Sequence, residues 1–304
     1  MNFSSDLIAH RLSHVESTAR ASLFAPAVRD KIVRYGAPIG CLIEHHQRLG
    51  RCMHRISDIF LDYETEGKVP LSGTVVIADA LENGSGRFDR SWHAPEGGLW
   101  LALALADTFI PEISRLLPFV AGIACCETIR EMGVRASLKW VNDLCFQNKK
   151  IAGVLCETMK SPVYGDKYFV IGIGININNQ QFPVELNGTA ECLRGFSGEK
   201  ANVTDVAYRL LGKLGWNIGL LHYQEECLLK VGDQIWENFI LKRWLELSDT
   251  VGRRVCYGFD VQKKPLYRAV VKEVNEEGGL VMLLEDGTCI TEYAGEIIYI
   301  DDAS

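Results

Sequence analysis

Unbroken or alternating runs of apolar residues predict β-strands in the middle of the chain. Each run has the length of a buried strand, and polar or glycine-containing turns separate them. Two of the runs flank Gln147–Lys150, which predicts a hairpin at that point. The strands are expected at residues 74–78, 99–106, 136–140, 144–146, 151–156 and 168–177.

Apolar positions at helical spacing predict four longer segments. A helix over residues 19–35 would follow the capping pair Ser17–Thr18 and end before the sequence Gly-Ala-Pro. Residues 41–62 carry apolar side chains at near-helical period, with Arg48, Arg51 and Arg55 on another face. The remaining helices are expected at residues 112–132, with Pro118 near the first turns, and at residues 203–245, with interruptions near Gly215, Gly219 and Gly232.

After residue 249 the pattern changes to short β-type runs with glycine turns between them, at 278–279 and 286–287. The five runs cover residues 254–257, 267–274, 280–284, 289–293 and 297–300. The expected fold is therefore a mixed α/β domain, a sheet flanked by helices, over residues 1–246, followed by a small all-β domain over residues 247–304. No internal repeat is visible.

Composition narrows the class of protein. The net charge of −7 disfavours a protein that coats nucleic acid. Ten scattered cysteines without a Cys-x-x-Cys pair predict free thiols and a reducing, cytoplasmic location. No apolar run approaches the roughly 20 residues of a membrane helix, and the N-terminus lacks a secretory pattern, so no membrane association is expected.

The segment Gly172–Asn178 indicates a ligand site. Strand alternation places Ile173, Ile175 and Ile177 on one face and two glycines with two asparagines on the other. Glycines inside a strand weaken it and leave space above the sheet. Asparagine amides beside that space supply donors and acceptors. The pattern favours a flat polar ligand on this face, with a bulged strand as the alternative.

A second candidate is Lys139, which lies between Leu138 and Trp140 in a predicted interior strand. A buried ammonium needs an anion beside it. Asp143 would satisfy this need structurally, whereas a bound carboxylate or phosphate would satisfy it functionally.

A third candidate is the glycine-containing loop around Arg87 and Arg90, which offers backbone amides and positive charge to phosphate oxygens. Flexible surface turns look similar, and the loop lacks the Gly-Lys-Ser/Thr ending of a Walker motif.

Taken together, the three segments resemble those of biotin–protein ligases. The similarity is close at Lys139–Asp143, at Ile151–Glu157 and at Gly172–Asn178. The β-type tail looks like the SH3-like C-terminal domain of that family. Ser17–Thr18 is similar to the start of its first motif. The resemblance covers roughly residues 12–300, apart from an insertion near residues 41–70.

The resemblance implies an ATP-dependent, adenylate-forming biotin–protein ligase that uses Mg²⁺ with ATP. Biotin's carboxylate would attack the α-phosphate, giving biotinyl-5′-AMP and pyrophosphate. A lysine of a biotin carboxyl carrier domain, as in acetyl-CoA carboxylase, would then attack the mixed anhydride. The task is mainly electrostatic, because two anions must be held together, and no protein nucleophile is needed.

Carried over residue by residue, the resemblance implies three groups of site residues and no protein-bound metal. Lys139 would bridge carboxylate and phosphate, with Arg87 and Arg90 on the phosphate. The acid pocket would be lined by Ser17, Thr18, Gly84, Gly86 and Gly153. The nucleotide would be bound by Trp92, Asn142 and Asn176.

The sequence departs from the family pattern where the acid is recognised. The loop usually reads Gly-Arg-Gly-Arg-Arg-Gly-Arg, but Ser85, Phe88 and Asp89 stand at three of these positions. Leu81 replaces a glutamine expected near the biotin ring, and Ala19 and Val141 replace the usual asparagine and proline. A ligase for another carboxylic acid, such as lipoate, and a binding protein without turnover therefore remain the alternatives.

The segments outside the resemblance add two expectations. Only about 16 residues precede Ser17, so no DNA-binding helix-turn-helix is expected. The insertion contains Cys41, His45, His46, Cys52 and His54, a density of soft ligands that permits zinc but matches no standard spacing. A helix covering the active site is the expected structure there. Its arginine row would either contact phosphates or an acidic carrier, or form a solvated face.

Overall fold

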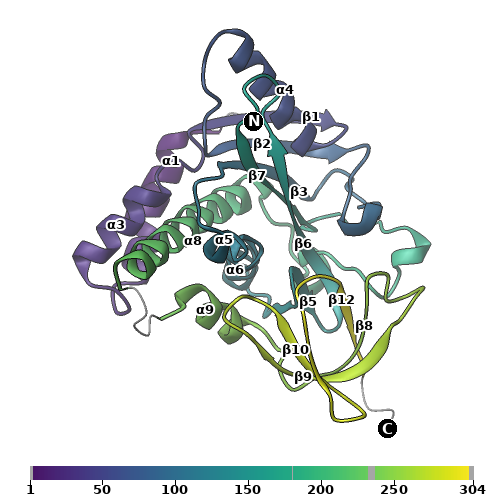
Figure 1. The fold of residues 1–304 in the computed structure, drawn as a ribbon. Coiled ribbons are helices and arrows are strands. Elements are labelled where there is room, and N and C mark those ends of the chain that lie inside the picture. Colours follow the sequence, from purple (N-terminus) through teal and green to yellow (C-terminus); the bar gives the residue numbers. More distant parts are fainter. Residues whose placement is uncertain (1–2, 180, 232–236, 301–304) are drawn as a thin grey trace.

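The computed structural model describes residues 3–179, 181–231 and 237–300 and contains two β-sheets of unequal size (Figure 1). The larger sheet has the strand order β1-β2-β3-β7-β6-β5-β4, and only β1 and β2 run parallel. In chain order its strands are β1 (Leu42–Leu49), β2 (Thr74–Leu81), β3 (Leu99–Ala106), β4 (Ser137–Lys139), β5 (Asp143–Phe146), β6 (Lys149–Lys160) and β7 (Lys167–Ile175). The six predicted central strands are thus confirmed.

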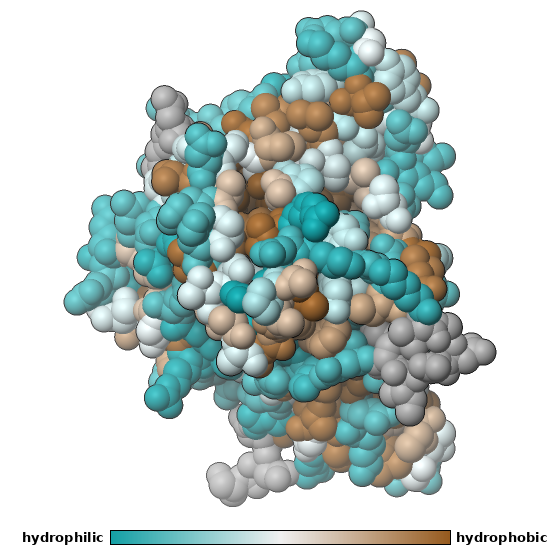
Figure 2. Space-filling model, turned by 90° about the vertical axis from the view of Figure 1, so that its left-hand side faces the viewer, coloured by the Kyte–Doolittle hydropathy of each residue, from teal (hydrophilic) through white to brown (hydrophobic). Residues whose placement is uncertain are grey.

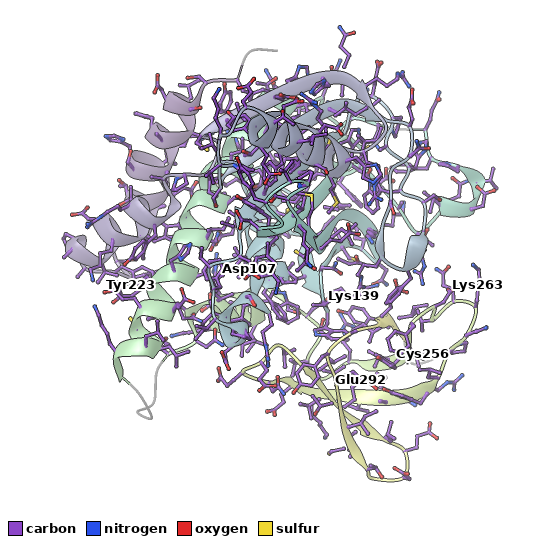
Figure 3. The ribbon with its side chains drawn as sticks, turned by 45° about the horizontal axis from the view of Figure 1, so that its top comes forward. Asp107, Lys139, Tyr223, Cys256, Lys263 and Glu292 are labelled. Carbon is purple, nitrogen blue, oxygen red and sulfur yellow. The ribbon has the colours of Figure 1, made fainter. Side chains whose placement is uncertain are left out.

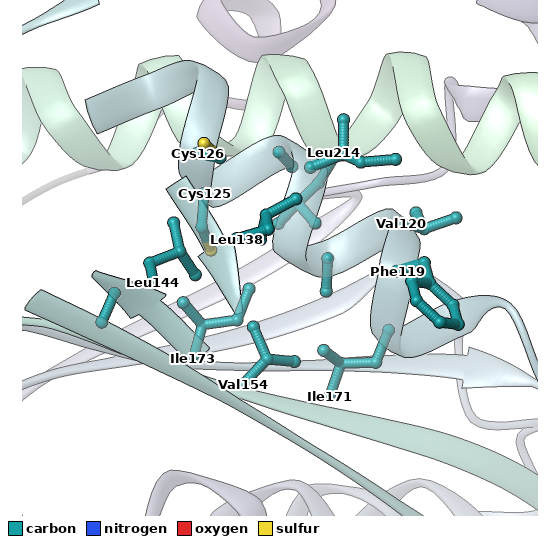
Figure 4. Packing of buried hydrophobic residues seen from close by; sticks show 14 of the residues in the cluster. Phe119, Val120, Cys125, Cys126, Leu138, Leu144, Val154, Ile171, Ile173 and Leu214 are labelled. Carbon is teal, nitrogen blue, oxygen red and sulfur yellow. The ribbon is translucent and has the colours of Figure 1, made fainter. Parts of the chain in front are cut away.

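One face of this sheet is apolar and packs against helices. Ile171, Ile173 and Ile175 alternate along β7 and are buried together with residues of α6 and α8 (Figure 4). The helices of the molecule are α1 (Ser5–His10), α2 (Ser17–Ala19), α3 (Pro26–Gly36), α4 (Cys52–Thr65), α5 (Pro111–Ser114), α6 (Leu117–Glu131), α7 (Leu193–Ser197), α8 (Val203–Val231) and α9 (Phe239–Leu247). This packing leaves the glycine face of β7 on the other side of the sheet.

Helix α4 covers only part of that second face. Its residues Cys52, Ile56 and Phe60 pack against small or branched side chains of β2 and β3 in a separate core cluster. Gly172 and Gly174 have no side chain to complete the layer. The sheet therefore keeps an uncovered area beyond the first turn of α4, which is where a ligand site can form.

The segment 41–62 does not form one helix. Residues 42–49 are strand β1, which pairs with β2 from Leu42↔Thr74 to Leu49↔Leu81, and the helix begins only at Cys52. Arg48 therefore lies on a strand and does not share a helix face with Arg51 and Arg55. The polar residues of an edge strand hid the alternation, and backbone pairing with β2 decided its conformation.

The N-terminal helices also lie at other residues than predicted. Helical structure runs from Ser5 to Ala19 through α1, the π-helical segment η1 (Arg11–Glu16) and α2, so Ser17 and Thr18 lie inside it rather than at a cap. The chain then breaks, and α3 starts at Pro26. Proline in the first turn is a common start signal, since its missing N–H costs nothing there.

The two central glycines of α8 do not interrupt it. The helix is continuous over 29 residues. A Cβ on Gly219 would lie 2.1 Å from the carbonyl oxygen of Ile32, and one on Gly36 would lie 1.9 Å from that of Gly215. The glycines thus allow the backbones of α3 and α8 to touch. The interruption predicted at Gly232 lies outside the described residues.

The C-terminal sheet has the order β11-β10-β9-β8-β12, and all of its strand pairs are antiparallel. Its strands are β8 (Arg254–Gly258), β9 (Tyr267–Val274), β10 (Leu280–Leu284), β11 (Cys289–Glu292) and β12 (Glu296–Tyr299). Trp140 Nε1 donates to Gly278 O at 3.1 Å, which ties this sheet to the larger one. The fold class is confirmed, and the domain boundary at 246–247 stays a prediction.

Apolar residues are also present at the surface, but in small groups. Figure 2 shows a face that is mostly hydrophilic, with hydrophobic residues gathered in limited patches. Among the described residues, no helix is both long and apolar enough to cross a membrane.

His222 on α8 makes the stability of this fold sensitive to acid. Its ring stacks on Phe109 with centroids 4.2 Å apart, and its Nδ1 lies 3.9 Å from Glu225 Oε2. Burial lowers the pKa of His222 to about 4 from an ordinary value of 6.5. Between pH 6.5 and 4 the unfolded chain binds a proton that the folded chain does not. The free energy of unfolding should therefore fall by on the order of 2 kcal/mol as pH falls through this window.

The variant His222→Phe keeps the ring contact and removes the titration. Urea unfolding of both proteins at pH 7 and pH 4.5 measures the effect. The variant should lose less stability than the wild type over this interval, with carboxylate titration common to both. Equal losses in the two proteins would show that His222 is not the acid-sensitive group.

Candidate functional site

A cavity of about 450 Å³ lies over the glycine face of the large sheet and reaches the C-terminal sheet. Figure 3 shows Lys139 at this level, between the large sheet and the strands that carry Cys256 and Glu292. Most of the residues predicted for the site line the cavity. They are Gly86, Arg87, Arg90, Trp92, Lys139, Asn142, Gly153 and Asn176.

The floor of the cavity is made by Gly153 on β6 and Gly174 on β7, which are paired in the sheet. The indole of Trp92 lies on this floor. A Cβ on Gly174 would come within 2.7 Å of Trp92 Nε1, and one on Gly153 within 3.2 Å of Trp92 Cζ3. Trp92 Nε1 is buried and has no hydrogen-bond partner. The indole ring of Trp92 therefore occupies the predicted space above the strand, and its Nε1–H group is available to donate a hydrogen bond to a ligand.

Lys139 lies at the end of β4 between Leu138 and Trp140, both of which are buried. Its Nζ is 3.9 Å from Asp143 Oδ2, so the ion pair considered from the sequence exists but is long. The lysine side chain keeps 21% exposure within a site of buried neighbours. This position leaves the ammonium able to approach a ligand anion in the cavity.

A second lysine, Lys150, faces the same carboxylate. Its Nζ lies 2.7 Å from Asp143 Oδ1 and 5.1 Å from the centroid of the Trp92 ring. Burial alone would raise the pKa of Asp143, but the charges of Lys150 and Lys139 lower it below the usual value. One ionised carboxylate therefore serves two ammonium groups, and the site keeps an excess of positive charge.

The sequence analysis did not predict Lys150 as a site residue, because it placed Lys150 in a hairpin turn, where the direction of a side chain cannot be predicted. The strands β5 and β6 shift register between Leu144 and Cys145, so that Ile151 has no partner. Such a bulge changes which side chains share a face. Lys150 comes to lie against Gly153, where a Cβ would meet its Cε at 3.1 Å.

The glycine-containing loop closes on itself beside the cavity. Gly86 N donates to Arg90 O at 2.8 Å, and Trp92 N donates to Gly84 O at 2.8 Å. Between them lies the short 3-10 turn η2 (Arg87–Asp89). Gly84 is not among the cavity residues, but its carbonyl accepts the hydrogen bond that holds the segment carrying Trp92.

The two asparagines have different surroundings. Asn142 Nδ2 donates to Val154 O, which turns its Oδ1 away, and that buried oxygen has no partner. Asn176 Oδ1 accepts a hydrogen bond from Asn179 Nδ2 at 2.9 Å. Both side chains line the cavity. Asn142 therefore offers a free acceptor to a ligand, while Asn176 is oriented by its neighbour.

Ser17 and Thr18 are not in the cavity. They lie in α2, and Ser17 O accepts a hydrogen bond from Arg29 Nη1 at 3.1 Å. The segment that reaches the cavity instead is the junction of β1 and α4, which supplies Arg51 and Met53. Arg51 and Met53 belong to the segment for which a covering helix was predicted, and the acid-binding role of Ser17 and Thr18 stays a prediction.

Apart from Arg51, the end of the cavity formed by this junction is apolar. Met53, Leu81 and Leu155 line it, together with Trp100. A Cβ on Gly172 would lie 3.0 Å from Met53 Sδ, so the thioether lies directly over that glycine. The cavity therefore has a cationic region around Lys139 and an apolar region around Met53, as required by a carboxylic acid with a nonpolar body.

In the part of the chain that the structure describes, no group of three or more His, Cys, Asp or Glu side chains is arranged to hold a metal ion. In the segment 41–54, His45 Nε2 instead lies 2.9 Å from Asp79 Oδ1, and His46 Nε2 lies 2.9 Å from Glu44 Oε2.

Comparison with known proteins identifies this arrangement. The pattern of the biotin/lipoate A/B protein ligase family matches residues 60–178, which include the glycine loop, both lysines and the glycine strand. Residues 60–178 are thus similar to the biotin/lipoate ligase family. The bifunctional ligase/repressor BirA of Bacillus subtilis is 32% identical over 213 residues, 65% of this chain and 65% of the relative. BirA of Escherichia coli is 27% identical over 229 residues, 74% of this chain and 66% of the relative.

Solved structures of biotin/lipoate ligases share the fold. The biotin protein ligase of Aquifex aeolicus, in complex with biotin and ATP, superposes with a TM-score of 0.67 at 24% identity and covers 85% of this chain and 98% of its own. The Leishmania major enzyme with biotinyl-5-AMP gives a TM-score of 0.52 at 18% identity, with coverage of 83% and 99%. The matched region spans about two thirds of the length of the BirA relatives. The solved structures share the fold with this chain.

Proposed function

We propose that the protein is an ATP-dependent biotin–protein ligase. The observation that carries the proposal is the pair Lys139 and Lys150, which converge on one carboxylate beside the glycine floor of the cavity. Two ammonium groups with a single anion between them suit a reaction that brings a carboxylate and a phosphate together. A relative that is named a biotin–[acetyl-CoA-carboxylase] ligase supports the choice of biotin.

The reaction consists of two transfers without a protein nucleophile. A carboxylate oxygen of biotin forms a bond to the α-phosphorus of ATP, and the bond from that phosphorus to pyrophosphate breaks. The amine of a carrier lysine then attacks the carbonyl carbon of the anhydride, AMP leaves, and the amine loses a proton. Lys139, Lys150 and Arg87 would balance the charge that develops at phosphorus.

The remaining cavity residues position the two substrates. Trp92 offers an aromatic surface for the adenine, and Asn176 and Asn142 offer amide groups to the nucleotide. Gly86 allows close approach of the acid, and Gly153 makes room for the Trp92 ring and the Lys150 side chain. Magnesium would be bound mainly by the phosphates of ATP, since the described residues form no acidic cluster for it. When bound, it would neutralise the leaving pyrophosphate.

The acceptor is proposed to be a lysine on a biotin carboxyl carrier domain. A relative from Mycobacterium tuberculosis, 27% identical over 150 residues, is named a biotin–[acetyl-CoA-carboxylase] ligase.

The ten cysteines are all free thiols in the structure, which supports the proposal of a reducing, cytoplasmic compartment where ATP is present.

A second candidate is a ligase of the same chemistry for a less polar acid. The observation that favours it is the apolar part of the cavity around Met53, where Leu81 also stands in place of the glutamine expected near a biotin ring. Apolar side chains at these positions offer fewer hydrogen bonds to the ureido group of biotin, whereas an aliphatic acid needs no hydrogen bonds there.

One experiment separates the two functions. The protein is incubated with Mg-ATP and biotin, lipoate or octanoate, and pyrophosphate and the retained acyl-adenylate are measured by mass spectrometry. The expected result is fastest adenylate formation with biotin. A preference for lipoate or octanoate would establish the second candidate. Binding of ATP without pyrophosphate for any acid would contradict both.

A further inference from the structure

The two arginines of the glycine loop have different partners in the C-terminal sheet. Arg90 forms a two-pronged ion pair with Glu296, with Nη1 2.7 Å from Oε1 and Nη2 2.7 Å from Oε2. Its Nη2 also lies 3.2 Å from Asp260 Oδ1 and 3.3 Å from Phe259 O. Two carboxylates and a carbonyl thus surround one guanidinium.

Arg87 is bound differently. Its Nη1 donates to the carbonyl oxygen of Gly295 at 2.9 Å, which leaves its positive charge without compensation by that partner. The same charge acts on Asp143 beside the two lysines. A phosphate in the cavity would find Arg87 able to respond, whereas at Arg90 it would have to displace two carboxylates.

An aromatic contact reinforces the ion pair. The ring of Phe88 meets Phe259 edge to face, with centroids 5.9 Å apart and planes at 85°. Phe88 has φ 56°, a left-handed conformation that is rare for a residue with a large side chain. The loop therefore keeps an unfavourable backbone turn at the point where its ring contacts the C-terminal sheet. Phe88 is also one of the residues that departs from the family pattern.

We propose that Phe88 and Arg90 fasten the glycine loop to Phe259, Asp260 and Glu296, and we call these five residues the loop latch. Arg90 and Glu296 are positioning residues in this proposal: they place Gly86 and Arg87 at the cavity and do not bind phosphate themselves. The proposal deepens the function proposed above, because it assigns the charge of Arg90 to the C-terminal sheet instead of to ATP.

The latch is tested with Arg90→Gln, Glu296→Gln and the double variant, by initial rates of pyrophosphate release at varied ATP. Each single change should lower kcat/KM about tenfold. The double variant should lose no more than Arg90→Gln, because that change already removes the contact with Glu296. If Arg90 is instead a phosphate ligand, Glu296→Gln frees it and leaves or improves the KM for ATP. That result would overturn the proposal.

A charge exchange adds a rescue that a phosphate-binding role does not allow. In an Asp260→Asn background, Arg90→Glu and Glu296→Arg should each be impaired, and the combination should recover to within about threefold of that background. A combination as inactive as Arg90→Glu alone would contradict the latch. The matched control is Arg115 with Glu277, a 3.2 Å pair to the C-terminal segment in which Arg115 is 39% exposed, compared with 37% for Arg90. Arg115→Gln should stay within twofold of the wild type.

A second measurement separates failure of the latch from failure of the proposed ligase. Hydrogen exchange of the backbone amides of residues 84–92 is followed in the ligand-free protein, where no turnover is needed. Exchange should be at least tenfold faster in Arg90→Gln and Phe259→Ala than in the wild type and unchanged in Arg115→Gln. An inactive wild type with this pattern would reject the ligase and keep the latch. Unchanged exchange in Arg90→Gln and Phe259→Ala would reject the latch whatever the activity.

Discussion

Replacing Lys139 by methionine is expected to reduce the rate of adenylate formation by about 100-fold to 1,000-fold while the protein stays folded. The methionine preserves an unbranched side chain between the buried Leu138 and Trp140 but removes the ammonium from the cavity. Loss of one preorganised positive group at a developing anion has an effect of this size in other enzymes. Lys150 remains beside Asp143, at 2.7 Å, so the carboxylate is not left unpaired.

Single-turnover pyrophosphate release with saturating Mg-ATP and biotin measures the effect. Lys149→Met is the matched control, because this lysine lies one residue from Lys150 but is paired with Glu191 at 3.2 Å and does not line the cavity. The control should react at the wild-type rate. Adenylate formation by Lys139→Met within threefold of the wild type would remove Lys139 from the mechanism.

Replacing Gly219 by alanine is expected to lower the free energy of unfolding by about 3 kcal/mol or more. The added methyl would lie 2.1 Å from the carbonyl oxygen of Ile32 and 3.0 Å from Gly36 N, so α3 and α8 must move apart. Separation of these helices exposes apolar surface along their contact and breaks close packing. The better helix propensity of alanine, about 1 kcal/mol, offsets only part of this loss.

Gly215→Ala on the same helix is the control for this prediction. Its methyl would meet the end of the Leu12 side chain at 3.2 Å and the carbonyl oxygen of Gly36 at 3.4 Å, which are contacts that small shifts can relieve. In chemical denaturation, the free energy of unfolding of Gly215→Ala should lie within about 1 kcal/mol of the wild-type value. It should be clearly higher than that of Gly219→Ala. Similar midpoints for the two variants would mean that the helices separate easily.

Several elements were predictable because their residues carry the whole signal locally. In β7 the isoleucines and glycines alternate strictly, and a strand must then bury one face and leave the other bare. The hairpin of β5 and β6 has its turn at Gln147 and Asn148, both with positive φ, as the polar residues between two apolar runs indicated. Lys139 faces the cavity because its buried neighbours leave it no other direction.

Other features depended on contacts between distant segments. Strand β1 is rich in polar residues, and only its pairing with β2 makes it a strand. Lys150 enters the site through a bulge that local alternation does not reveal. The partners of Arg90, Asp260 and Glu296, lie some 170 and 206 residues away in the chain. No spacing rule connects groups at such separations.

The sequence by itself determined where six strands of the large sheet lie along the chain, the small β-sheet at the C-terminus and the glycine face of β7 with Lys139 nearby. Periodicity and the cost of burying charge act within a few residues, so the chain displays them directly. Only the tertiary structure decided which cations share Asp143, which segment supplies the apolar end of the cavity and which sheet binds Arg90. These outcomes follow from the packing of elements against one another, where geometry across the fold sets which charges and surfaces meet.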